Sequence, residues 1–247
     1  MSARLLVVNP NTTASMTAAI GAAARTHAAP GTEIDAVTAP WGTPSIESHA
    51  EEALAAAAVL EVVAERADAY DGVAIACFGD PGLEAARELA PVPVVGIAEA
   101  AMLLALPLAH RFSIVAALDR ARPLMDDVVR RHGLQARCAS VRTTGLSVLE
   151  IDADPEGAEA AIAAAGRRAV QEDGAEAICL GCAGMGPLDA RIGAALGVPV
   201  IDGVAAAVKL LEALVGYGRA TSRVAAFRAP EAKALTGPLS LPGSTRA

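Results

Sequence analysis

The sequence predicts an α/β protein made of two similar parallel-sheet domains of flavodoxin-like topology, related by a pseudo-twofold axis, with the active site in the cleft between them. Three observations predict this fold class. Short runs rich in β-branched residues alternate with long alanine-rich segments, as strands alternate with helices in α/β proteins. The runs form two successive sets of four. A cysteine with glycine and proline after it follows the third run of each set.

The two sets of predicted strands match in order. The first set covers Arg4–Asn9, Thr32–Thr38, Gly72–Cys77 and Val92–Gly96. The second set covers Arg111–Ala116, Gln135–Arg142, Ala175–Gly181 and Val198–Asp202. The segments between them are predicted helices, such as 47–69 and 154–173. Strands joined by helices favour a parallel sheet that is covered on both faces.

The landmarks of the two sets recur at a nearly constant interval. Arg4 and Arg111 open the first strands 107 residues apart, and Cys77 and Cys182 close the third strands 105 residues apart. Any α/β protein gives similar runs, but the shared place of the cysteines favours a true repeat. Open α/β sheets bind ligands at the carboxyl ends of their strands. Two units facing each other there would bring both cysteines to one cleft from opposite sides.

The composition points to a small-molecule partner. The chain has 247 residues, of which 53% are hydrophobic and 2% aromatic, and a formal net charge of −8. Few aromatics and no basic run argue against nucleic acid or an anionic membrane as partners. No secretory signal or bilayer-spanning run is recognisable. We therefore expect a cytoplasmic protein whose four cysteines are reduced thiols.

Cys77 and Cys182 are the candidate catalytic residues. Each ends a predicted strand region and precedes a predicted helix start, where the helix dipole and free amide groups are expected to lower a thiol pKa. Glycines around each cysteine let backbone N–H groups approach a ligand. Two opposed thiols suit proton removal beside a carbonyl on one face and proton return on the other, while the amides stabilise the enolate oxygen. This chemistry is racemisation or epimerisation and needs no cofactor.

The remaining cysteines and the histidines are interpreted as structural. Cys138 and Cys179 lie inside predicted strands, as small buried hydrophobes do. Cys179 and Cys182 form a Cys-x-x-Cys pair, but no second pair completes a zinc site, and their side chains are expected on opposite faces of the strand. The four histidines are predicted to be solvated helix positions without metal-ligand spacing, and no metal site is expected: His27, His49, His110 and His132.

Two further segments end strands at the edge where the cysteines lie. In the first, Asn-Pro-Asn-Thr-Thr, the side chain of Asn9 or Asn11 is a candidate substrate contact, while Asn11, Thr12 or Thr13 suits a helix cap. In the second, which begins at Trp41, Ile46 is a candidate apolar contact in a loop over the cleft. The structural interpretation of that second loop is a helix cap at Ser45 or Ser48.

Several motifs together resemble the hydantoin racemase branch of the aspartate/glutamate racemase superfamily, whose allantoin racemases share nearly the same motifs. The motifs are VVNPNTT, SIES, ACFGDPGL, VGIAEAA, LGCAGM and VPVIDGVAAAVK. The resemblance implies two α/β domains around one cleft, cofactor-free two-base chemistry on Cys77 and Cys182, and a homo-oligomer. It also implies that the last helix, from about Val204, returns to the first domain. The predicted division is therefore 1–96 plus 205–247 and 97–204, with a tail from Thr236 ordered only by contact.

Departures from the superfamily pattern bear on the substrate. Amino-acid racemases resemble this chain in having two cysteines, but Asn-Thr follows the first and Thr follows the second. Here Phe78 and Gly79 follow the first cysteine, and Ala183 and Gly184 follow the second. An apolar ring and backbone in these places favour a neutral or weakly acidic ring, such as a cyclic ureide. Arylmalonate decarboxylases resemble the fold but keep one catalytic cysteine, so the pair favours racemisation.

Three functions remain open from the sequence. The first is racemisation of 5-substituted hydantoins or allantoin. The second is racemisation of an amino acid of the aspartate or glutamate type. The third is a non-catalytic protein that binds a small ligand on the same scaffold. The sequence does not assign either thiol to one enantiomer.

Overall fold

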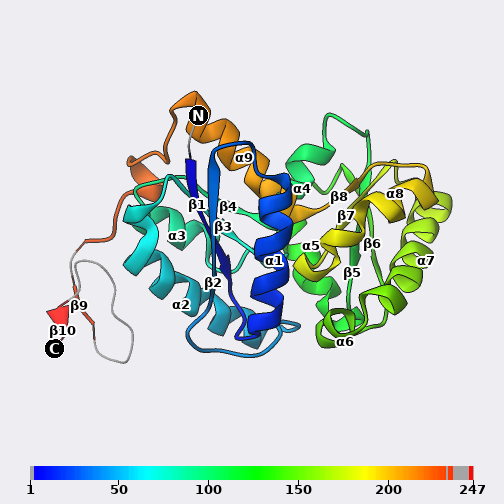
Figure 1. The fold of residues 1–247 in the computed structure, drawn as a ribbon, viewed down its shortest axis with the longest axis horizontal. Helices are drawn as coiled ribbons and strands as arrows, with labels where there is room; N and C mark the ends of the chain where they lie inside the picture. The colour runs from blue at the N-terminus through cyan, green and yellow to red at the C-terminus, as the bar shows by residue number, and fades with distance from the viewer. Residues whose placement is uncertain (1–2, 232, 236–244, 247) are drawn as a thin grey trace.

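The computed structural model describes residues 3–231, 233–235 and 245–246, and it contains two four-stranded parallel sheets (Figure 1). The first sheet has the order β2-β1-β3-β4, from β1 (Ala3–Asn9), β2 (Thr32–Thr38), β3 (Gly72–Ile75) and β4 (Val94–Gly96). The second has the order β6-β5-β7-β8, from β5 (Phe112–Ala116), β6 (Cys138–Thr143), β7 (Ala177–Leu180) and β8 (Val200–Ile201). The matching order confirms the predicted fold class of two similar parallel-sheet domains.

Helices connect the strands in the predicted alternation. The first half contains α1 (Ala14–His27), α2 (His49–Arg66), α3 (Leu83–Leu89) and α4 (Ile97–Ala105). The second half contains α5 (Arg122–Arg131), α6 (Val148–Ala153), α7 (Pro155–Asp173), α8 (Asp189–Leu196) and α9 (Gly203–Tyr217). Short 3₁₀ turns are η1 (Ala67–Ala69), η2 (Asp119–Ala121), η3 (Ala183–Leu188) and η4 (Ala225–Phe227), and a small two-stranded ladder joins β9 (Ala234–Leu235) to β10 (Thr245–Arg246).

The alternation of side chains along β1 separates two hydrophobic layers. Leu5 and Val7 belong to a central core shared by both halves, whereas Leu6 and Val8 belong to the outer core under α2 and α3. Successive side chains of a strand point to opposite faces, so a continuous apolar run is what a sheet covered on both sides requires. Figure 1 shows α1, α4, α5 and α9 between the sheets, with α2 and α3 outside one sheet and α7 and α8 outside the other.

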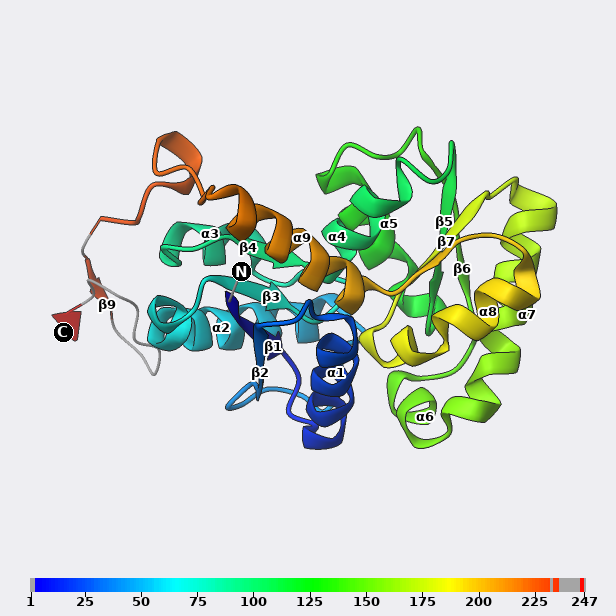
Figure 2. The ribbon, with the colours of Figure 1, turned by 45° about the horizontal axis from the view of Figure 1, so that its top comes forward.

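Helices α4 and α9 cross between the halves. α4 follows the first sheet but packs against β7 and β8, whereas α9 follows the second sheet but packs against β1, β3 and β4. The two helices also contact each other (Figure 2). The small alanine side chains of α4, Ala98, Ala101 and Ala105, are buried and allow close helix packing. The residue boundaries of the two domains stay a prediction.

The strand ends differ by a few residues from the prediction. β3 ends at Ile75, so Ala76 and Cys77 belong to the following loop. β4 begins at Val94 rather than Val92, because Pro93 has no N–H to donate to the sheet. Most of the predicted tail from Thr236 lies outside the described residues. Within the described chain, no helix has both the length and the hydropathy that a membrane span requires.

Candidate active site

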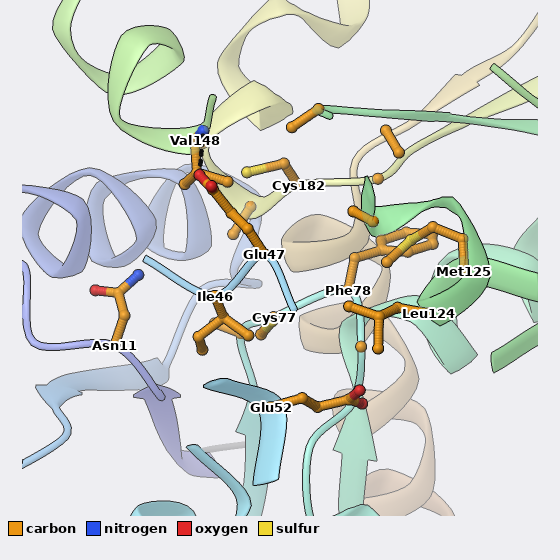
Figure 3. Close-up of a pocket in the computed structure, with 18 of the residues that line it drawn as sticks. Asn11, Ile46, Glu47, Glu52, Cys77, Phe78, Leu124, Met125, Val148 and Cys182 are labelled. Atoms are coloured by element: carbon orange, nitrogen blue, oxygen red, sulfur yellow. Dashed lines mark hydrogen bonds between the residues drawn. The ribbon is translucent and has the colours of Figure 1, made fainter. Parts of the chain in front are cut away.

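A pocket lies at the carboxyl ends of both sheets, and both candidate cysteines line it (Figure 3). Cys77 lies in the loop after β3, and Cys182 is the residue before η3 in the loop after β7. Both thiols are half-buried. The parallel strands of each sheet aim their carboxyl ends at the same edge, so equivalent loops of the repeat meet there. Each half therefore contributes one thiol to the same pocket.

The loop that carries Cys77 is fastened to the start of α4 by a buried aspartate. The N–H of Asp80 donates to the carbonyl of Cys77 at 2.9 Å, and the Asp80 carboxylate accepts from the N–H groups of Ala98 and Glu99 at 3.0 and 2.8 Å. A Cβ on Gly96 would lie 2.1 Å from the Asp80 Cγ, so only glycine fits there. Asp80 itself has a φ of +48°, a conformation that costs an ordinary residue about 1 kcal/mol or more.

The loop that carries Cys182 packs closely against an aspartate that caps the start of α9. Asp202 precedes α9, and its carboxylate accepts from the N–H groups of Val204 and Ala205 at 2.9 and 3.2 Å. A Cβ on Gly186, in the cysteine loop, would lie 2.6 Å from an Asp202 oxygen. In the first half, Asp80 on the cysteine loop faces Gly96, which precedes α4. In the second half the residue types are exchanged, because Gly186 on the cysteine loop faces Asp202, which precedes α9. The Cys77 loop is thus hydrogen-bonded to α4, whereas the Cys182 loop is packed against the start of α9.

The surroundings of the thiols overturn the predicted direction of their pKa shifts. Burial raises the pKa of Cys77 to about 12 and that of Cys182 to about 11, although backbone N–H groups of Gly79 and Gly184 donate to the two sulfurs and oppose the shift. α3 begins only at Leu83, so Cys77 does not lie at a helix N-terminus. Cys182, Glu52 and Asp80 also contribute to raising the pKa of Cys77, and Glu47 and Asp152 to raising that of Cys182. The sequence shows that a cysteine lies near a helix, but not how completely the folded chain buries it from water.

The lining is mainly apolar and has two carboxylates. Met16 and Ile20 come from α1, and Leu124 and Met125 come from the equivalent helix α5. Glu47 and Glu52 also line the pocket, and no Lys or Arg is among its described lining residues. Burial raises the pKa of Glu52, and Arg131 partly opposes this shift. Neither glutamate was predicted from the sequence, although they flank the start of the helix after the predicted cleft loop.

Glu47 links the two halves across the pocket. Its Oε1 accepts the N–H of Val148 in α6 at 2.9 Å (Figure 3). Nearby, the Ser15 hydroxyl donates to Asp152 at 3.0 Å, which is a second contact between the halves. The loop that holds Glu47 ends at Ser48, whose hydroxyl caps α2 by accepting from the Glu51 N–H. The helix cap considered at Ser48 is therefore present.

The structure brings most of the predicted contact residues to the pocket. Its lining includes Asn11, Ile46, Phe78, Gly79, Ala183 and Gly184. Asn9 is not in the lining; it lies behind Asn11, and its amide nitrogen donates to the Asn11 Oδ1 at 2.9 Å. That oxygen also accepts from the Thr13 N–H, so the Asn11 amide nitrogen is left on the side toward the pocket (Figure 3). Its protein contact is a weak acceptor, the sulfur of Met16, at 3.2 Å.

The other two thiols and the four histidines differ in how deeply they are buried. Cys179 is fully buried in the central core, and Cys138 is half-buried at the start of β6. His49 and His110 are exposed, and His27 is half-buried at the end of α1. The prediction of a solvated position is wrong for His132, whose side chain is 14% exposed and lies between two carboxylates. A residue at the end of a helix is usually exposed, but here Asp80 and Glu99, which are distant in the chain, lie beside the ring.

Comparison with known proteins finds close relatives over nearly the whole chain. A hydantoin racemase of Pseudomonas sp. (strain NS671) is 45% identical over 237 residues, which is 96% of this chain and 95% of that protein. The structure of the allantoin racemase from Klebsiella pneumoniae is 50% identical, with a TM-score of 0.93, and the match covers 96% of this chain and 97% of that one. The allantoin racemase structure from Pseudomonas fluorescens is 46% identical, with a TM-score of 0.90, and covers 95% and 100%.

The fold and these relatives define the class of protein as a racemase, which is an isomerase. The chain spans nearly the full length of each relative. It belongs to the Asp/Glu/Hydantoin racemase family, whose model matches residues 5–211.

Proposed function

We propose that this protein racemises a neutral cyclic ureide, a 5-substituted hydantoin or allantoin, with Cys77 and Cys182 as the two bases. The observation that carries the proposal is the pair of thiols that equivalent loops of the repeat contribute to one pocket. The named relatives, a hydantoin racemase and two allantoin racemases, support the substrate class. Residues 1–96 plus 205–247 and 97–204 would form the two domains around this pocket.

In the proposed mechanism, one sulfur acts as a thiolate and the other as a thiol. The thiolate removes the proton from the ring carbon beside the carbonyl, and the electron pair of the broken C–H bond moves into the enolate. The opposite thiol then delivers its proton to the other face, and its sulfur becomes the thiolate. The high pKa of each thiol makes its thiolate a strong base, which suits a weakly acidic carbon, while the resting pocket holds mainly thiols.

The charge of the lining favours a neutral substrate over an amino acid. Glu47 and Glu52 contribute negative charge, and the described lining holds no cation to pair with a substrate carboxylate. A ureide ring instead offers N–H groups that a carboxylate can accept and carbonyl oxygens that the Asn11 amide nitrogen can donate to. Ile46 and Phe78 would pack against the ring, and the backbone at Gly79, Ala183 and Gly184 would lie close to it.

The experiment that tests the proposal is loss of optical rotation without added cofactor. The panel contains the L- and D-forms of several 5-substituted hydantoins, allantoin, aspartate and glutamate. We expect racemisation of at least one ureide and a higher kcat/KM for it than for either amino acid. A higher value for aspartate or glutamate would make the protein an amino-acid racemase, and binding without turnover of any compound would make it a ligand-binding protein.

Two further expectations belong to the same proposal, one on oligomeric state and one on cellular location. The family resemblance favours a homo-oligomer, and the sequence favours a cytoplasmic protein. Light scattering of the purified protein measures the first, and fractionation of the source cells measures the second.

A further inference from the structure

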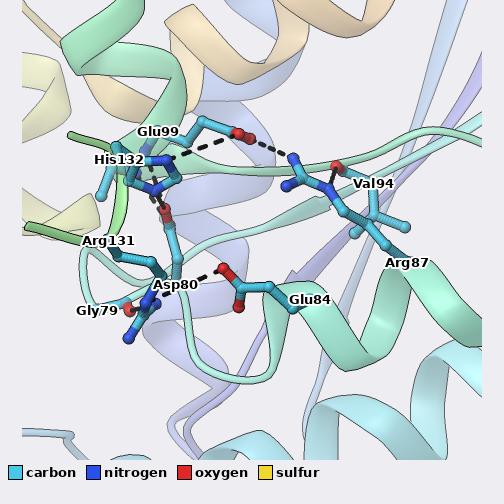
Figure 4. Close-up of polar contacts among 9 residues, drawn as sticks. Gly79, Asp80, Glu84, Arg87, Val94, Glu99, Arg131 and His132 are labelled. Carbon is cyan, nitrogen blue, oxygen red and sulfur yellow. Dashed lines mark hydrogen bonds and ion pairs between the residues drawn. The ribbon is translucent and has the colours of Figure 1, made fainter. Parts of the chain in front are cut away.

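The end of α5 contacts the Cys77 loop from the other half of the molecule (Figure 4). The Nη1 of Arg131 donates to the carbonyl of Gly79 at 3.3 Å, and its Nε lies 4.0 Å from a Glu84 oxygen. The next residue, His132, lies beside Asp80, the carboxylate that fastens the Cys77 loop to α4. Gly79 lines the pocket, whereas Arg131, His132 and Asp80 are not among its lining residues.

The His132 ring lies between two anchored carboxylates without a hydrogen bond of its own. Its Nε2 is 3.8 Å from Oδ2 of Asp80, and its Nδ1 is 3.9 Å from Oε1 of Glu99. Both separations exceed hydrogen-bond length. Across the described part of the chain, this Nε2 is the one buried side-chain nitrogen or oxygen that lacks a partner. Glu99 is itself held by Arg87 at 2.5 Å, so neither carboxylate is free to swing toward the ring.

A small movement of α5 would give the ring its missing bond. A hydrogen bond of about 2.9 Å needs a shift of about 1 Å from the observed separation. α5 also supplies Leu124 and Met125 to the pocket, so a substrate that these side chains contact acts on the same helix. The helix therefore connects the substrate site to the back of the Cys77 loop.

The corresponding contact differs on the Cys182 side. The loop after β7 is covered by α1 and α9, and Asp202 is its buried carboxylate. His27, at the equivalent end of α1, acts electrostatically on Asp202, but no hydrogen bond or ion pair among the described residues joins a histidine or arginine side chain to Asp202. A change at His132 should therefore reach Cys77 and leave Cys182 nearly unaffected.

We propose that His132 is a positioning residue for Cys77. It bridges Asp80 in the first half and α5 in the second, and it holds the Cys77 loop so that the sulfur lies against the substrate carbon. The proposal rests on the proposed racemisation for its effect on turnover, but its effect on the Cys77 loop does not need a substrate.

The first test measures the loop alone. His132→Phe keeps a ring but removes both nitrogens, His132→Asn retains a donor, and His110→Phe changes an exposed histidine as the control. Each protein is treated with iodoacetamide, and the Cys77 and Cys182 peptides are quantified separately. We expect His132→Phe to speed alkylation of Cys77 by on the order of tenfold, because a loosened loop exposes the buried thiol. Cys182 should stay within about twofold, His132→Asn should lie closer to the unmodified protein, and the control should not differ. Equal change at both thiols, or at neither, would overturn the proposal.

The second test measures turnover on the best ureide. His132→Phe should lower kcat by about 10- to 100-fold with KM nearly unchanged, as expected for a misplaced base. Exchange of the ring-carbon proton with D₂O should fall for the enantiomer that depends on Cys77 and persist for the other. Should His132→Phe fail to unfold cooperatively, His132→Met removes both nitrogens with a flexible apolar side chain and is measured instead. Absence of turnover on every ureide would count against the proposed function, while the alkylation rates would still decide the role of His132.

Discussion

The pH dependence of alkylation tests the surroundings that the structure gives the two pocket thiols. Burial raises the pKa of Cys77 to about 12 and that of Cys182 to about 11, whereas an unfolded thiol ionises near pH ~8.5. Since the thiolate is the reactive form, the reactive fraction at pH 8 is about 10⁻⁴ for Cys77, about 10⁻³ for Cys182 and about a quarter for an unfolded thiol.

The assay follows iodoacetamide labelling of each cysteine peptide between pH 7 and 10. We expect both rates in the folded protein to rise about tenfold per pH unit without a plateau, because each thiol remains mostly protonated over this range. In denaturing urea, all four cysteines should instead level off above about pH 8.5. The slope is the diagnostic quantity, since the greater nucleophilicity of a high-pKa thiolate changes the rate but not the slope. A plateau in the alkylation rate at or below pH 8 for Cys77 or Cys182 in the folded protein would refute the account that burial raises the pKa of both thiols.

Three further predictions follow from the same contacts. Glu52→Gln should reduce the preference for a neutral ureide over an anionic ligand by about tenfold, or ~1.4 kcal/mol, because a pocket carboxylate no longer repels the anion. Competition by N-carbamoyl amino acids measures this preference, with exposed Glu65→Gln as the control, and unchanged selectivity would contradict the prediction. Gly96→Ala should lower the free energy of unfolding by about 3 kcal/mol, because the added methyl meets the Asp80 carboxylate. Urea denaturation measures this change, and the control Gly193→Ala, whose nearest contact would be 3.5 Å away, should lower the free energy of unfolding far less. The thiol pKa values are raised in the folded state, so the thiols favour folding fully below pH ~8.5, and this contribution is lost as pH rises toward 11 and 12, by up to about 1.4 kcal/mol per pH unit for each thiol. In urea denaturation between pH 8.5 and 10, the free energy of unfolding of Cys77→Ala and of Cys182→Ala should therefore fall less steeply with pH than that of the parent. Slopes identical to the parent would contradict the pKa shifts.

The sequence predicted the sheets and the meeting of the two thiols because both depend on local signals and on the repeat. The short apolar run within Arg4–Asn9 predicted a strand covered on both faces, and β1 has its two core layers accordingly. The equal spacing of Cys77 and Cys182 within their units placed them in equivalent loops, and parallel sheets bring such loops to one edge.

The remainder depends on packing between segments that are distant in sequence. The pKa of each thiol was predicted in the wrong direction, because dryness comes from α1 and α5 rather than from neighbours in the chain. Glu52 could be identified as a helical residue, but not as one that faces Gly79. His132 ends a helix, where an exposed side chain is the usual outcome, and only the contact with Asp80 and Glu99 shows otherwise.

The most direct test of the two-base account is proton exchange in D₂O by single cysteine variants. Loss of one acid–base group should slow racemisation in both directions by on the order of 10²- to 10⁴-fold. Cys77→Ser should still exchange the ring-carbon proton of one enantiomer with retention of configuration, because its proton faces Cys182, and Cys182→Ser should exchange the opposite enantiomer. Proton NMR of each pure enantiomer, with chiral chromatography of the product, measures exchange and configuration together. Complementary exchange by the two variants is the predicted result, whereas exchange of the same enantiomer by both, or racemisation by either at nearly the parent rate, would contradict the account.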